Sequence, residues 1–145
     1  MKILQVNNYG YLRGGSDRYF FDLSSLLREN GQSVIELVTE DSRNILSAPW
    51  EVKGFSPDNP RAQDLVKYFY SYDARKVAQQ LVEEVKPDLV HLHIYYGQMT
   101  PSILSVFKSY GIPIVQTLHE YKLICPVATM VRNGRVCDSC ASGSF

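Results

Sequence analysis

Three residues near the amino terminus, Gly14, Gly15 and Ser16, stand where a protein can bind an anion. They follow a short apolar run at residues 2–7 and open an amphipathic segment that ends near residue 30. Glycines let the backbone approach a ligand closely, and the N–H groups at a helix start attract negative charge. The pattern is neither a GxGxxG fingerprint nor a P-loop. It predicts a phosphate-binding turn, with an ordinary turn capped by Ser16 as the alternative.

A histidine and a glutamate, His119 and Glu120, follow an apolar run at residues 112–118. Histidine at such a place can serve as a base, a charge stabiliser or a hydrogen-bond donor to a sugar hydroxyl. The alternative is a histidine that bonds to backbone at the end of a strand. We therefore treat His119 as the candidate catalytic residue, with Glu120 as a candidate ligand for an acceptor.

A second polar group, His93, Tyr95 and Tyr96, follows the apolar run at residues 88–93. Alternation along a strand places His91 and His93 on the same face. We expect His91 to pack near the core, and His93 to lie at the rim of a crevice with the two tyrosines as acceptor-binding residues. A metal pair is an alternative, although these two histidines supply too few ligands for a complete site.

The chain has three cysteines, Cys125, Cys137 and Cys140, of which the last two form a CxxC pair. An odd number without a secretory signal argues against a disulfide scaffold. Three readings remain open for the pair: a partial zinc site completed by other residues, a redox motif, or free structural thiols.

Strand and helix patterns alternate along most of the chain, as expected for elements that position these residues. The first helix is expected to turn one apolar face to the core, formed by Tyr19, Phe20, Leu23, Leu26 and Leu27. Further strands are predicted at residues 33–39, near 52–55, at 88–93 and at 112–118, with helices at 61–70, 72–86 and 101–110, the last capped by Thr100. A hairpin around Asn133-Gly134 is predicted at residues 128–136. The alternation predicts a doubly wound α/β fold with a parallel sheet.

Parallel strands end at one edge of such a sheet, and ligands bind beyond that edge. The glycine turn, the loop after residue 93 and the His119 loop would therefore face one crevice. This shared edge is the main sequence argument for a binding site.

Composition limits the functional classes. The chain has 145 residues, is 45% hydrophobic and has a formal net charge of zero, which predicts one domain with a substantial core and no nucleic-acid partner. No apolar run is long enough for a transmembrane helix. The amino terminus begins with a strand pattern rather than a signal sequence, so we expect a cytoplasmic protein.

Several segments together resemble the amino-terminal half of a retaining GT-B glycosyltransferase of the large group 1 (GT4) family. They are residues 2–8, the Gly14-Gly15-Ser16 turn, residues 87–93 and residues 112–121. Residues 122–140 are similar to an insertion found in one branch of that family. No single motif is specific, but the combination covers essentially the whole chain.

The resemblance implies a two-domain Rossmann-like enzyme of which residues 1–145 form the acceptor-side domain. It implies that Gly14, Gly15 and Ser16 lie near the diphosphate of a nucleotide-sugar, that His119 reaches the transferred sugar, and that no cofactor is required. A sugar, lipid or polysaccharide would be the acceptor, with peripheral contact to the inner face of the membrane as an added expectation for the complete enzyme. The donor-binding domain is absent from this chain, which is therefore expected to be inactive alone. A single-domain nucleotide-binding or regulatory module is the competing interpretation.

Overall fold

Five parallel strands form the centre of the computed structural model, which describes residues 1–46, 49–54 and 69–140. The strands are β1 (Lys2–Val6), β2 (Ser33–Thr39), β3 (Trp50–Val52), β4 (Leu89–Leu92) and β5 (Ile114–Gln116). Their spatial order is β3-β2-β1-β4-β5, so β1 lies at the centre between β2 and β4. The predicted doubly wound α/β fold is confirmed.

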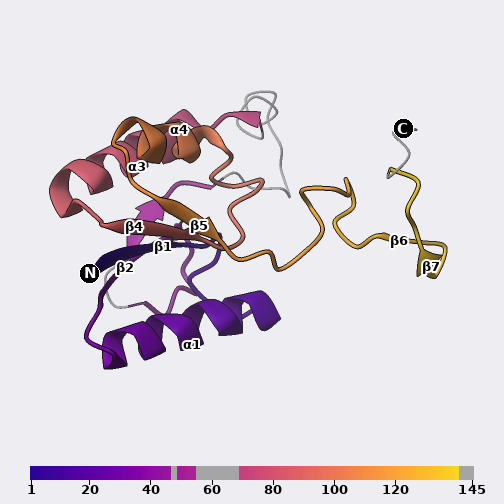
Figure 1. Ribbon diagram of the computed structural model, residues 1–145, viewed down its shortest axis with the longest axis horizontal. Helices are drawn as coiled ribbons and strands as arrows, with labels where there is room; N and C mark the ends of the chain where they lie inside the picture. Colours follow the sequence, from indigo (N-terminus) through magenta and orange to yellow (C-terminus); the bar gives the residue numbers. More distant parts are fainter. Residues whose placement is uncertain (47–48, 55–68, 141–145) are drawn as a thin grey trace.

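Helices cover both faces of this sheet (Figure 1). Helix α1 (Gly15–Glu29) lies on one face, and α3 (Tyr72–Val85) and α4 (Ser102–Ser109) lie together on the other. Helix α3 is capped at its start by the Ser71 hydroxyl, which accepts a hydrogen bond from the Ala74 N–H at 3.1 Å. The right-handed crossovers that parallel strands require explain why the helices are divided between the faces.

The two faces of the sheet differ in chemistry. The apolar core lies on the α3 and α4 side, and its strand residues include Leu4, Val6, Val90 and Leu92. The alternate residues of the same strands face α1, and many of them are polar: Gln5, Glu36, His91 and His93. Glu36 pairs with Arg28 of α1 across this layer. The sheet is therefore held by an apolar layer on one side and a largely polar one on the other.

The polar layer changes the expected orientation of α1. Its buried residues are Asp17, Phe20 and Ser24, whereas Tyr19 and Leu26 are about half exposed, at 45% and 54%. The prediction that Tyr19 and Leu26 belong to the buried face is wrong. Apolar periodicity points a helix toward an apolar surface, and here the facing strands present buried polar residues, such as Gln5 and Glu36, beside the apolar Ile3 and Val38.

Most element bounds lie within one or two residues of the prediction. Strand β2 matches it, α4 begins at Ser102 after a cap at Pro101 rather than at Thr100, and β3 lies slightly earlier than residues 52–55. The predicted helix at residues 61–70 lies almost wholly outside the described residues.

Two features lie at the end of the described chain. Strand β5 forms one edge of the sheet, and its Ile114 and Val115 are 38% and 49% exposed. Beyond it, a hairpin of β6 (Val131–Arg132) and β7 (Arg135–Val136) extends away from the sheet (Figure 1). Asn133 and Gly134 have φ values of 52° and 72°, which confirms the predicted turn with two left-handed residues.

Candidate functional site

The loops that follow β1, β4 and β5 converge at one edge of the sheet, as predicted. Two asparagines directly after β1 join them: the Ile94 N–H donates to Asn7 Oδ1 at 3.2 Å, and Asn8 Nδ2 donates to the Tyr96 carbonyl at 2.8 Å. Both asparagines are buried. Their amides therefore fix the loop after β4 against the end of β1.

The glycine turn enters α1 in an open conformation. Helix α1 begins at Gly15 with Gly14 as its cap residue, so the alternative of a helix capped by Ser16 is wrong. The Asp17 carboxylate instead binds the backbone at the start of the helix. Its Oδ2 accepts hydrogen bonds from the N–H groups of Arg13 and Gly14, at 3.1 Å each. Asn7 Nδ2 donates to the other oxygen of Asp17 at 3.0 Å.

Nothing in the described part of the chain demands glycine at this turn. The backbone of Gly14 is extended, and a Cβ added to Gly14 or Gly15 would meet no atom within 4 Å. Across residues 1–46, 49–54 and 69–140, no acceptor bonds the N–H groups of Gly15 and Ser16. The turn thus offers free donors and open space at the positive end of a helix.

The three histidines form one cluster at the same edge. His93 Nδ1 lies 3.0 Å from His119 Nε2, and the rings of His91 and His93 lie 4.4 Å apart. Tyr19 of α1 places its ring 5.3 Å from the ring of His119. The cluster therefore joins the loops after β4 and β5 to the first turns of α1.

The expectation that His93 lies at the rim is wrong, because only 1% of it is exposed. Its ring lies on the α1 face of the sheet and packs against Phe20 at 5.4 Å between centroids. His119 is the more exposed member and lies outside His93. His91 is half-buried on the α1 face of the sheet and contacts Thr117 Oγ1 at 2.7 Å.

The environment keeps these rings neutral near pH 7. Burial, with smaller effects from His91 and His119, lowers the pKa of His93 to about 3. Burial also lowers the pKa of His119, although the carboxylates of Asp17 and Glu120 oppose that shift. A neutral imidazole has one N–H and one bare nitrogen, so each ring has a defined donor and acceptor side.

The candidate acceptor residues separate into buried and accessible ones. Tyr95 is 4% exposed and belongs to the apolar core, so its side chain cannot contact an acceptor in this conformation. Tyr96 is half-buried, and its hydroxyl accepts a hydrogen bond from Gln116. Glu120 lines a cavity of about 360 Å³ with Leu118, His119, Tyr121, Leu123 and Ile124. Their positions in the sequence alone could not predict which of these side chains are buried and which are accessible.

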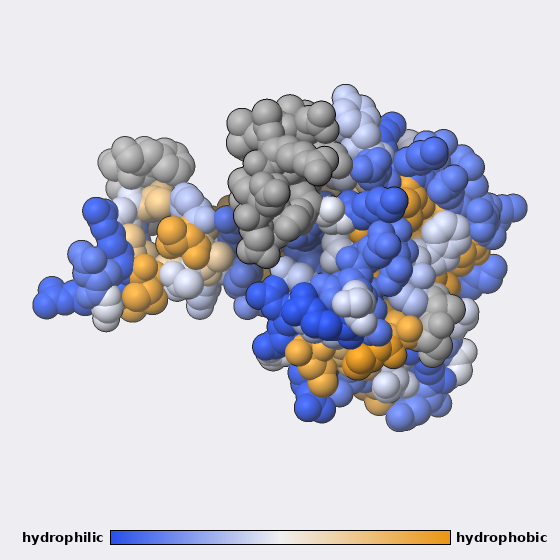
Figure 2. All heavy atoms as spheres, turned by 180° about the vertical axis from the view of Figure 1, so that it is seen from behind, coloured by the Kyte–Doolittle hydropathy of each residue, from blue (hydrophilic) through white to orange (hydrophobic). Residues whose placement is uncertain are grey.

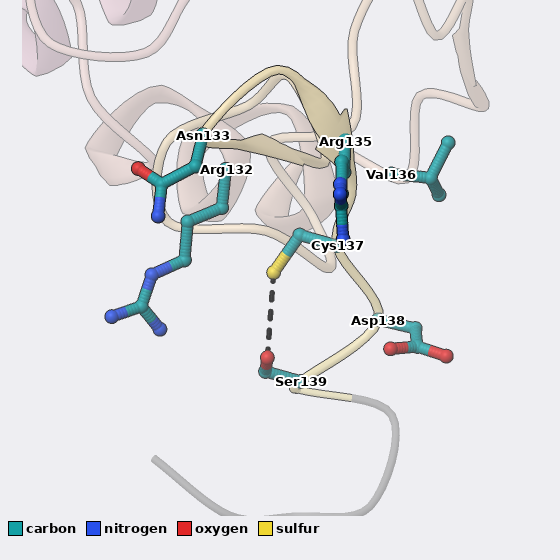
Figure 3. A pocket seen from close by; sticks show the side chains of 7 residues that line it. All are labelled: Arg132, Asn133, Arg135, Val136, Cys137, Asp138 and Ser139. Carbon is teal, nitrogen blue, oxygen red and sulfur yellow. Dashed lines mark hydrogen bonds between the residues drawn. The ribbon is translucent and has the colours of Figure 1, made fainter.

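The cysteines lie apart from this cluster. Cys137 lies in a hollow of about 510 Å³ beside the hairpin, where its Sγ faces Ser139 Oγ at 3.4 Å (Figure 3). Cys125 is buried, and all three cysteines are free thiols. Within the described ranges, no three His, Cys, Asp or Glu side chains are arranged to hold a metal ion. Cys137 and Cys140 thus have no completing ligands among those residues.

Sequence reasoning missed three residues that organise the site: Gln5, Asn7 and Asp17. Each is buried and hydrogen-bonded to a predicted site residue or to the loop that carries one. A signal was present for two of them, since polar residues inside or directly after an apolar strand require partners. Asp17 carried a different signal, an acidic side chain three residues after a helix cap.

The parallel sheet and its strand-end loops define a Rossmann-like α/β domain of the GT-B type. The family model for Glycosyltransferase Family 4 matches residues 13–130, so the chain belongs to that family, as its amino-terminal domain.

Among solved structures, the crystal structure of Acinetobacter baumannii MurG is similar, with a TM-score of 0.51 and 16% identity. The match covers 79% of this chain and 33% of that one, so this chain spans about a third of that protein's length. No curated protein matches the chain. No helix among the described residues has the length and apolar character needed to cross a membrane.

Proposed function

We propose that this chain is the acceptor-side half of a retaining glycosyltransferase that moves a hexose from a nucleotide-sugar to an acceptor. One observation carries the proposal: the half-buried His119 lies against α1 at the carboxyl ends of the strands, where the open Gly14-Gly15 turn also lies. Family membership supplies the reaction class. The second domain would hold most of the donor, because GT-B enzymes bind it between two domains.

The glycine turn is the proposed contact for the donor diphosphate. Gly15 and Ser16 offer N–H groups at a helix start, and the missing side chains leave room for phosphate oxygens. The buried Asp17 carboxylate already accepts three hydrogen bonds, two of them from the turn. These hydrogen bonds fix the conformation of the turn. They leave the N–H groups of Gly15 and Ser16 for the ligand.

His119 is the proposed contact for the transferred sugar. Retaining transfer passes through a state with oxocarbenium character, by analogy with glycoside hydrolysis. A group that interacts more strongly as charge develops raises kcat more than it lowers KM. A half-buried but accessible imidazole beside the glycine turn is suited to stabilising that charge.

The acceptor is proposed to lie against Glu120 and Tyr96. The cavity beside Glu120 combines this carboxylate with the apolar side chains of Leu118, Leu123 and Ile124. Such a mixed surface fits a sugar that carries an apolar group, as a lipid-linked acceptor does. Figure 2 shows hydrophobic and hydrophilic side chains mixed on the projecting carboxyl-terminal segment.

Replacing His119 by alanine in the enzyme that carries both domains tests the proposal. We expect His119→Ala to lower kcat by about 10²-fold, the scale for a positioned catalytic group, with little change in the donor KM. Val115→Ala, at an exposed position of β5, is the matched control for disturbance of the strand. A lower melting temperature with unchanged kcat would instead assign His119 a purely structural role.

A further inference from the structure

A line of hydrogen-bonded side chains runs from the centre of the sheet to the candidate catalytic histidine. Gln5 Oε1 on β1 lies 2.5 Å from Nε2 of His93, at the end of β4. Nδ1 of His93 lies 3.0 Å from Nε2 of His119, in the loop after β5. Gln5 and His93 are fully buried, so their hydrogen bonds are shielded from water.

The chemistry of these atoms sets the position of each hydrogen along the line. The Gln5 carbonyl oxygen only accepts, so His93 Nε2 carries the hydrogen between them. The neutral His93 ring then has a bare Nδ1, which can only accept. His119 Nε2 must therefore be the donor in the second contact.

His119 is left with one bare nitrogen, Nδ1. Among the described residues, no donor is within hydrogen-bond distance of that atom. A bare imidazole nitrogen accepts a hydrogen bond and repels anionic oxygen. It therefore suits a hydroxyl group and not a phosphate.

We propose that Gln5 and His93 are positioning residues that hold His119 as its Nε2–H tautomer and leave Nδ1 to accept a hydrogen bond from a sugar hydroxyl. The identity of that hydroxyl rests on the proposed function, whereas the tautomers are a property of this chain alone. For a neutral His119 with this hydrogen-bond partner, the geometry favours accepting a hydrogen bond from a sugar hydroxyl and excludes the role of donor to that hydroxyl.

Nitrogen-15 NMR of the histidine side chains in the 145-residue chain tests the tautomers without substrate. We expect His93 and His119 both to give the Nε2–H pattern at neutral pH. An Nδ1–H pattern for either ring in the unmodified chain would overturn the proposal, because it would mean that the Gln5 amide presents its nitrogen to His93. This measurement needs no variant, so it does not depend on whether a substituted chain folds.

Two variants of Gln5 test whether its hydrogen bond to His93 sets the tautomers of both His93 and His119. Gln5→Leu removes the acceptor, so we expect His93 and His119 to populate both tautomers. Gln5→Glu keeps an oxygen that can accept, so we expect it to preserve the Nε2–H pattern. Ser24→Ala is the matched control, because Ser24 of α1 is buried against the same face of the sheet and its hydroxyl has no partner among the described residues. Unchanged tautomers in a folded Gln5→Leu chain would contradict the proposal.

Kinetics of the enzyme with both domains separate this inference from the proposed function. We expect Gln5→Leu to lower kcat by about 10- to 100-fold, by analogy with the loss of a partner that orients a metal-binding histidine, with the donor KM retained. Gln5→Glu should recover most of that loss. If Gln5→Leu keeps full kcat while His119→Ala does not, the positioning role is wrong and the proposed function stands. If His119→Ala keeps full kcat, the proposed contact between His119 and the transferred sugar is wrong, and the NMR tautomers alone decide whether Gln5 and His93 position the His119 ring.

Discussion

The two adjacent glycines illustrate how a residue can be required by something outside its own fold. A Cβ at Gly14 or Gly15 would meet no neighbour within 4 Å, in contrast to Gly10, where it would lie 2.6 Å from Asn44 Oδ1. Gly10 is thus closely packed inside this chain, and a side chain there would have to displace Asn44. The open turn at Gly14 and Gly15 fits the proposal that a ligand approaches it.

Gly15→Val tests whether glycine is needed at this turn for the fold or for the approach of a ligand. The valine side chain has room in the free protein, so we expect the melting temperature to change little. In the enzyme with both domains, its branched side chain would block the approach of the donor diphosphate. Loss of a charge-assisted contact costs about 1.5–3 kcal/mol, so kcat/KM should fall roughly tenfold to a hundredfold.

The control for that measurement is Ser25→Val, at an exposed position of the same helix. It adds a similar side chain away from the turn. Wild-type kinetics in folded Gly15→Val would mean that the glycine pair is only a turn.

Individual site residues were predictable where the signal is local. The glycine turn, the paired faces of His91 and His93 and the left-handed turn at Asn133-Gly134 all follow from neighbouring residues. The hydrogen bond between Gln5 and His93 joins positions 88 residues apart, and that between His93 and His119 joins positions 26 apart. No local pattern contains such contacts, because they depend on which strands become neighbours.

At the scale of elements, local sequence patterns predicted the bounds of the helices and strands. The residues that face α1 across the sheet decided which side of that helix is buried. Branched residues and glycine stops placed the strands and helices well. The orientation of α1 was wrong because its apolar periodicity says nothing about the polar residues of β1, β2 and β4 that face it. Burial of Ser24 in place of Leu26 shows that the facing layer, and not the helix alone, selects the buried side.

The start of α3 offers a test at this scale. Ser71 is 4% exposed, its hydroxyl caps the helix, and its N–H donates to Thr100 Oγ1 at 3.1 Å. We expect Ser71→Ala to lower the free energy of unfolding by about 1 kcal/mol and the melting temperature by about 3 °C. Ser25→Ala, at an exposed position of α1, should change neither. An unchanged melting temperature in Ser71→Ala would show that the N–H groups at the start of α3 find another acceptor.

At the scale of the molecule, this chain contains one of the two surfaces that we propose enclose the donor. The Acinetobacter baumannii MurG chain, of which the match covers 33%, shows how much longer a protein of similar fold can be. We expect the 145-residue chain alone to release no nucleotide from sugar-nucleotides in a sustained manner, because we propose that a second domain holds most of the donor. The measurement is nucleotide release across a panel of donors with and without acceptor sugars.

A two-domain enzyme of the same family serves as the positive control for that assay. Sustained, acceptor-dependent turnover by the 145-residue chain would show that the half-enzyme proposal is wrong. It would also require a complete donor site within the residues present.

The edge position of β5 has a consequence for how the molecule behaves among its own copies. Ile114 and Val115 are apolar and branched, and they are substantially exposed on a strand that borders no other described strand on its outer side. An edge of this kind is a template on which another chain can add a strand. Self-association of this chain is therefore expected to begin at β5, and a charged residue in place of Val115 would be expected to suppress it.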